Sequence, residues 1–130
     1  MQSDPTVFIV DDDEGAREAT QWLLESAGLS VEPYSRAEDF LQTYTPSRAG
    51  CLVVDLVMPG MNGVELVREL DSRGCSMPII MVTGSGDGDP RLRGLSDRLY
   101  GLLDKPGDPR ALLDLVRAAL KEVADGPSGS

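Results

Sequence analysis

The chain has 130 residues, of which 41% are hydrophobic and 26% are charged. This size and composition are typical of one soluble globular domain and argue against a disordered or a membrane-embedded protein. The net charge of −10 argues against a nucleic-acid surface on this domain, because phosphate binding needs clustered Lys and Arg.

Five short apolar runs have the length and composition of β-strands. Their hydrophobicity is continuous rather than alternating, which indicates strands that are covered on both faces, as in a parallel sheet. In chain order the predicted strands are residues 7–10, 30–34, 51–55, 78–83 and 99–103.

Helical patterns lie between and after these strands. One stripe runs through Ala16, Ala19, Leu23 and Ala27, and a second occupies residues 37–44, where Ser35 and Glu38 are spaced as a capping box. Gly28 and Gly74 are placed to end the first and third helices, and the last helix starts at Pro109 with Asp108 as N-cap. A fourth helix near 89–98 is expected to be short or mobile because of its glycines.

The alternation of strands and helices predicts an α/β domain, a doubly wound five-stranded parallel sheet with helices on both faces. We expect this domain to span residues 1–124 and residues 125–130 to form a flexible tail, either a linker or an artificial extension. No apolar run approaches the roughly 20 residues of a membrane span and no signal-peptide pattern is visible, so we expect a cytoplasmic protein without membrane contact.

The cysteine and histidine counts exclude several kinds of functional site. Cys51 and Cys75 are too few for a disulfide framework and are expected to be free thiols. The chain has no histidine, which excludes His-based metal sites, Ser-His-Asp triads and a phosphohistidine donor within it. Any phosphoryl donor would have to act in trans.

Polar residues follow four of the predicted strands. Asp11, Asp12 and Asp13 follow the first strand, Asp55 ends the third, Thr83 ends the fourth and Lys105 follows the fifth. Because the carboxyl ends of parallel strands share one edge of the sheet, these side chains are expected to converge. Asp13 is interpreted as a helix cap rather than a ligand.

Three carboxylates at one site repel one another unless cations compensate their charge. Mg²⁺ prefers oxygen ligands, which two or three aspartates and a backbone carbonyl supply, and Lys105 adds a second positive charge. This arrangement leaves Asp55 ionised as a nucleophile, with Thr83 available to hydrogen-bond a phosphoryl oxygen.

These motifs resemble the receiver domains of bacterial response regulators in two-component systems. The resemblance is carried by Val10-Asp11-Asp12, by Asp55-Leu-Val-Met-Pro59-Gly60-Met-Asn-Gly63, by Thr83-Gly84 and by Lys105-Pro106, and it covers about residues 6–121. It implies a flavodoxin-like fold with strand order 2-1-3-4-5.

The resemblance also implies roles. Asp55 would be the phosphoacceptor, Thr83 the switch hydroxyl and Lys105 the phosphate partner, and Mg²⁺ would be held by Asp11, Asp12, Asp55 and the carbonyl of Val57. Such a domain is not an enzyme in the usual sense. It assists its own phosphorylation by a sensor histidine kinase or a histidine phosphotransfer protein, loses the phosphoryl group slowly, and switches conformation to control an output domain or partner, sometimes by homodimerisation.

The segment 83–87 is similar to receivers that precede helix-turn-helix output domains, which would make transcription regulation the output. Two features depart from the family pattern: Leu102 stands where an aromatic residue usually reports phosphorylation, and Arg98-Leu99 replaces a usual Gly-Ala. They favour an altered signalling route and leave a second hypothesis open, a phosphorylation-independent interaction module. A third, a phosphatase that uses Asp55 as nucleophile, is opposed by Val57, which occupies the place of the second aspartate that such enzymes usually need.

Overall fold

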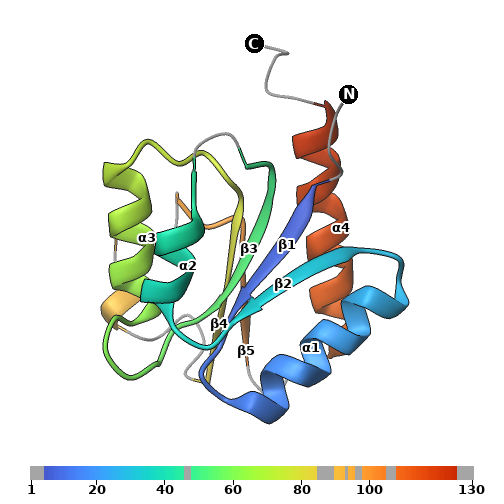
Figure 1. Ribbon diagram of the computed structural model, residues 1–130, viewed down its shortest axis with the longest axis horizontal. Coiled ribbons are helices and arrows are strands. Elements are labelled where there is room, and N and C mark those ends of the chain that lie inside the picture. The colour runs from blue at the N-terminus through green and yellow to red at the C-terminus, as the bar shows by residue number, and fades with distance from the viewer. Residues whose placement is uncertain are drawn as a thin grey trace.

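A computed structural model describes residues 5–45, 48–84, 90–92, 94–95, 98–104 and 108–125. It has five parallel strands in the order β2-β1-β3-β4-β5, which confirms the predicted α/β fold and its topology. The strands are β1 (Thr6–Val10), β2 (Ser30–Tyr34), β3 (Gly50–Asp55), β4 (Ile79–Thr83) and β5 (Gly101–Asp104). Figure 1 shows helices on both sides of this sheet.

The helices are α1 (Glu14–Ser26), α2 (Ala37–Thr43), α3 (Gly63–Ser72) and α4 (Pro109–Asp125). Helices α2 and α3 cover one face of the sheet, and α1 and α4 cover the other (Figure 1). Strand residues alternate between these two sides, since Phe8 packs with α2 and α3 while Val7 and Ile9 pack with α1 and α4. The continuous apolar runs of the strands therefore supply two cores.

Most predicted helix ends are confirmed. The Asp13 side chain accepts hydrogen bonds from the backbone N–H groups of Gly15 and Ala16, and the Asp108 side chain accepts one from Arg110 N–H. Gly28 has φ +87° just after α1, a left-handed conformation that favours glycine. These caps fix where the loops leave the helices.

Three local predictions are wrong. The N-cap of α2 is Arg36, without a side-chain cap bond, so Ser35 and Glu38 form no capping box. In α1, Ala19 is exposed and the fully buried residue is Leu24, because only part of the predicted apolar stripe of this helix is buried against the sheet. The fifth strand begins at Gly101 rather than Leu99.

The fourth predicted helix is reduced to a 3₁₀ turn, η2 (Pro90–Leu92), within the described part of 89–98. Leu92 and Leu95 are nevertheless buried in the α2 and α3 core. Arg98 bonds the Asp71 carboxylate and donates to the carbonyl oxygen of Cys75 at 2.9 Å, which attaches this segment to the end of α3. Asp125, the first residue of the predicted tail, is the last residue of the final helix, and residues 126–130 lie outside the described residues.

Candidate metal and phosphoryl site

The strand register aligns the acidic residues at one edge of the sheet. Val10 pairs with Val54, so Asp11 and Asp55 follow in line at the ends of neighbouring strands. Asp55 in turn pairs with Val82, which places Thr83 one residue further along β4. The convergence that the sequence predicts for these residues thus follows from parallel pairing.

Asp11, Asp12 and Asp55 form a carboxylate cluster in which one oxygen from each residue lies within 4.8 Å of the others. Asp11 and Asp55 are buried, whereas Asp12 is exposed. Buried carboxylates at this spacing are destabilised by mutual repulsion unless a cation binds between them. An all-oxygen donor set with one side open to water fits Mg²⁺.

Local hydrogen bonds orient the two buried carboxylates. The backbone N–H of Asp13 donates to Asp11 Oδ1 at 3.0 Å, and the backbone N–H of Val57 donates to Asp55 Oδ1 at 3.3 Å. Each carboxylate therefore has one oxygen held by the loop that follows its own strand. Both residues also have further interactions within the molecule.

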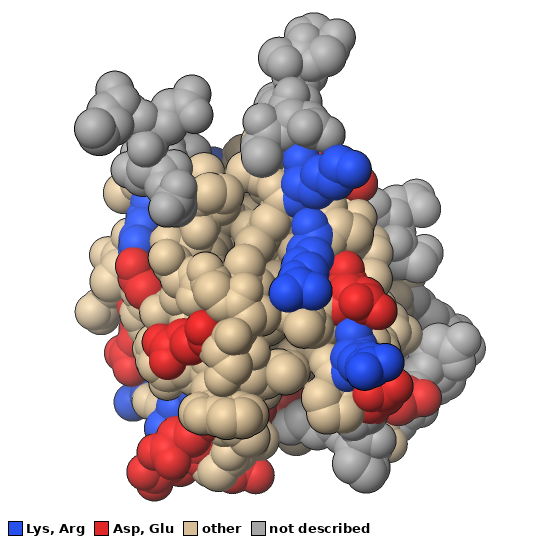
Figure 2. Space-filling model, turned by 90° about the vertical axis from the view of Figure 1, so that its right-hand side faces the viewer, with Lys and Arg blue, Asp and Glu red and all other residues tan. Residues whose placement is uncertain are grey.

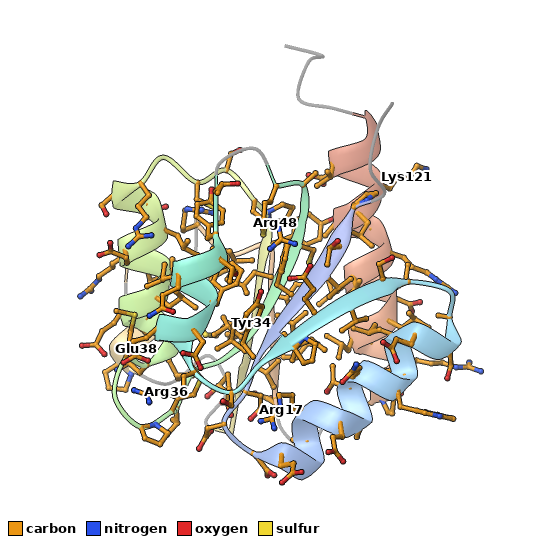
Figure 3. All side chains as sticks on the ribbon, viewed as in Figure 1. Arg17, Tyr34, Arg36, Glu38, Arg48 and Lys121 are labelled. Carbon is orange, nitrogen blue, oxygen red and sulfur yellow. The ribbon has the colours of Figure 1, made fainter. Side chains whose placement is uncertain are left out.

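Arg17 contributes to this edge although sequence reasoning did not select it. Its Nη1 donates to the carbonyl oxygen of Asp11 at 2.8 Å, so the first turns of α1 are attached to the end of β1 (Figure 3). The signal available in the sequence was its position, four residues after the capping residue Asp13, which returns a helical side chain toward the preceding strand.

The loop after Asp55 is closely packed. Gly63 begins α3 so near to β3 and β4 that a Cβ atom there would lie 2.8 Å from the Asp55 carbonyl oxygen and 2.8 Å from Met81 Sδ. The Asn62 side chain caps α3 in a reciprocal capping box with Glu65. Glycine at position 63 and the cap together hold the loop that carries Val57, whose side chain is exposed.

Of the two remaining predicted site residues, Thr83 has a described position and Lys105 does not. Thr83 is fully buried at the end of β4, where it pairs with Asp104 and has interactions of its own. Lys105 and Pro106 lie outside the described residues, so the predicted phosphate partner has no described position. Cys51 and Cys75 are free thiols, as predicted, and both are buried.

The described residues contain no helix that is both long and apolar enough to cross a membrane. Acidic and basic side chains are mixed on the side of the molecule that carries α1 and α4, and acidic ones gather at the lower left of the view (Figure 2). The lower end of both views is the end at which β1 finishes and α1 begins (Figure 1).

Comparisons with known proteins agree with this geometry. A family model described as the response regulator receiver domain matches residues 7–117. The transcriptional regulatory protein FixJ of Azorhizobium caulinodans is 40% identical over 119 residues, which cover 92% of this chain and 56% of that protein. The response regulator protein TodT of Pseudomonas putida is 38% identical, over 88% of this chain and 51% of TodT.

Solved structures show the same similarity. The response regulator StyR matches with a TM-score of 0.89 and 38% identity, over 98% of this chain and 64% of the StyR chain. The crystal structure of FixJ-N matches with a TM-score of 0.83 and 34% identity, over 93% of this chain and 97% of that one. The chain spans about half the length of the two curated relatives.

Proposed function

Because this chain belongs to the receiver domain family of two-component response regulators, we propose that it accepts a phosphoryl group on Asp55 from a phosphohistidine of a partner protein. The observation that carries the proposal is the cluster of Asp11, Asp12 and Asp55 at the ends of β1 and β3. Phosphoryl transfer to an aspartate needs a correctly positioned carboxylate and cations that neutralise the charge of the phosphoryl group. It does not need a separate general acid or base.

Mg²⁺ is the cofactor that the donor set favours. Asp11, Asp12 and Asp55 would hold it together with the carbonyl oxygen of Val57, which belongs to the loop fixed by Gly63. When bound, the ion neutralises charge on the phosphoryl oxygens and on the three carboxylates.

The transfer forms one bond and breaks one. An oxygen of the Asp55 carboxylate attacks phosphorus, the P–N bond to the donor imidazole breaks, and its electron pair stays on the imidazole nitrogen. In our proposal Lys105 pairs with the phosphoryl group and the Thr83 hydroxyl donates to one of its oxygens. Water later hydrolyses the acyl phosphate slowly, so the domain acts as a switch rather than as a turnover enzyme.

The added charge at Asp55 would favour a conformation with Thr83 and Lys105 drawn toward the phosphoryl group, and thereby change partner affinity. The donor would be a sensor histidine kinase or a histidine phosphotransfer protein. FixJ is named a transcriptional regulatory protein, and we propose a similar output for the longer protein of which this domain would be a part, with homodimerisation on phosphorylation as one route.

One observation favours a second candidate, an interaction module that works without phosphorylation. Leu102 replaces the aromatic residue that usually reports phosphorylation, and it packs against the α2 and α3 core. An aliphatic side chain in this position has no ring to rotate between an outward and an inward state, so binding alone would control such a module.

Intact-mass measurement after incubation with Mg²⁺ and acetyl phosphate tests the proposal. We expect an acid-stable, base-labile adduct of about 80 Da that is absent with EDTA and absent in Asp55→Asn. Asp39→Asn is the matched control, because Asp39 is an exposed aspartate on α2 that is not one of the cluster residues. It should keep the adduct.

Two outcomes would contradict the proposal. An adduct that persists in Asp55→Asn would place the phosphoryl group elsewhere. No adduct in the folded wild-type chain, with either acetyl phosphate or a phosphohistidine donor, would favour the interaction module.

A further inference from the structure

The turn between β1 and α1 consists of residues 11–13 and carries two of the three cluster carboxylates, those of Asp11 and Asp12. Asp11 is buried, and its backbone N–H donates to the carbonyl oxygen of Tyr34 on β2 at 3.1 Å, so the sheet holds it in place. Asp12 is exposed, so side-chain packing restrains it little. The position of the Asp12 carboxylate therefore depends mainly on how the backbone of this turn is held.

The peptide groups on both sides of Asp12 are held by side chains. The peptide group between Asp11 and Asp12 accepts a hydrogen bond on its carbonyl oxygen from Arg17 Nη1 at 2.8 Å. The peptide group between Asp12 and Asp13 donates its N–H to Asp11 Oδ1 at 3.0 Å. Because a peptide group is planar, a hydrogen bond to one of its atoms restrains the whole plane. Rotation of the Asp12 backbone is thus restricted from both sides.

Arg17 is itself held in place by the first turn of α1. Its backbone N–H donates to the Asp13 carbonyl oxygen at 2.9 Å, and the Asp13 side chain caps the same turn. Arg17 is half-buried, and Figure 3 shows it between the end of β1 and α1. Among the described residues it forms no ion pair with a carboxylate. It therefore restrains the turn without occupying a carboxylate oxygen.

We propose that Arg17 is a positioning residue of the metal site. By holding the peptide group between Asp11 and Asp12, it keeps the exposed Asp12 carboxylate within reach of an ion at Asp11 and Asp55. Mg²⁺ demands nearly octahedral geometry, and a ligand that is restrained before binding costs less free energy to order. The inference rests on the proposed function, because it requires Mg²⁺ at the cluster.

The charge of Arg17 acts on the metal with the opposite sign. A guanidinium beside the Asp11 carbonyl group repels a divalent cation, so loss of the charge alone would strengthen Mg²⁺ binding. This repulsion is weakened by water and salt, whereas loss of a hydrogen bond that orients a ligand costs about tenfold or more in metal affinity. The restraint therefore outweighs the repulsion. The sign of the change in Mg²⁺ affinity separates a positioning role from a purely electrostatic one.

Mg²⁺ titration of the unphosphorylated chain, followed by amide chemical shifts, tests the proposal. Arg17→Met keeps an unbranched side chain but removes the donor and the charge, and should raise the Mg²⁺ dissociation constant about tenfold. Arg17→Lys keeps the charge and a donor group, and should recover part of that loss. Arg68→Met is the matched control, because Arg68 is exposed on α3 and its substitution changes the net charge equally. This control should bind Mg²⁺ as the wild-type chain does.

A measurement without metal checks the restraint itself. In EDTA, the Asp13 amide hydrogen, which is bonded to Asp11 Oδ1, should exchange with water several-fold faster in Arg17→Met than in the wild-type chain. The increase should exceed that of the β1 and β3 amides inside the sheet, since an equal increase would indicate only a general loss of stability. Circular dichroism checks that each variant is folded. If Arg17→Met is not folded, the same comparison is made with Arg17→Lys, for which a smaller rise is expected.

Two results would overturn the inference in a wild-type chain that binds Mg²⁺. The first is an unchanged or lower dissociation constant in the folded Arg17 variants, which would leave Arg17 with no role or with that of a repelling charge. The second is an equal change in Arg68→Met, which would trace the effect to net charge. Failure of the folded wild-type chain to bind Mg²⁺ would contradict the metal of the proposed function, and this inference with it. An absent phosphoryl adduct in a chain that binds Mg²⁺ would contradict only the phosphoacceptor role.

Discussion

The two faces of the sheet are packed differently. On the α2 and α3 side, Phe40 is fully buried and its ring lies 5.4 Å from that of Phe8 and 5.6 Å from that of Tyr34, centroid to centroid. On the α1 and α4 side, an open groove is lined by residues of both helices and of the sheet, among them Ile9, Leu23 and Leu112, and Trp22 at this groove is exposed. The α2 and α3 face is thus closely packed, whereas the α1 and α4 face leaves apolar surface accessible beside the acidic cluster.

Truncation of a large side chain on each face gives the largest expected contrast. Phe40→Ala should lower the free energy of unfolding by about 3–5 kcal/mol, because it leaves a cavity among packed rings. Leu112→Ala, on the groove side, should lower it by about 1 kcal/mol, since Leu112 is only half-buried. Urea denaturation measures both, and equal losses would mean that the groove side is packed as tightly as the other.

Gly63→Ala tests how firmly the closely packed face holds the site. The added methyl group would meet the Asp55 carbonyl oxygen and Met81 Sδ, so we expect a loss of about 1–3 kcal/mol and slower phosphorylation of Asp55. Gly15→Ala is the control, because its Cβ would meet only the Asp13 carboxylate at 3.6 Å. Unchanged stability and adduct formation in Gly63→Ala would contradict the tight packing of this loop.

The smallest expected effect concerns a thiol beneath the groove-side helices. Burial raises the pKa of Cys51 to about 12, so its thiolate is scarce at neutral pH. In a Cys75→Ala chain, the rate of alkylation of the folded protein should rise with pH and show no plateau near the free-thiol value of about 8.5. A plateau there in the folded protein, as expected for the unfolded one, would mean that Cys51 is reached by water.

The parallel sheet and its acidic edge could be predicted from the sequence because both depend on local patterns, whereas the strand order was implied by the resemblance to receiver domains. Continuous apolar runs mark buried parallel strands, and the residues that follow them must meet at one edge. Asp11 and Asp55 were identified in this way. Arg17 was not, because its contact is with a backbone carbonyl, and its helical spacing from Asp13 alone does not distinguish it from other surface arginines.

The groove could not be predicted from helical periodicity. A stripe such as Ala16, Ala19 and Leu23 shows which side of a helix faces the sheet, but not how closely two helices approach each other. Ala19 is exposed for this reason, and Leu24 takes the buried place. The prediction of Ser35 as N-cap was also wrong, because α2 begins one residue later than the capping-box motif implies.

The alternation of strand residues limits which changes in chain length this domain tolerates. Val53 and Asp55 share the groove side, whereas Ile79 and Met81, which precede Thr83 at even spacing, pack on the α2 and α3 side. Insertion or deletion of one residue within β3 or β4 would exchange these sides and separate Asp55 from its present neighbours. Within these two strands, only insertions or deletions of two residues should therefore keep each side chain on its present face.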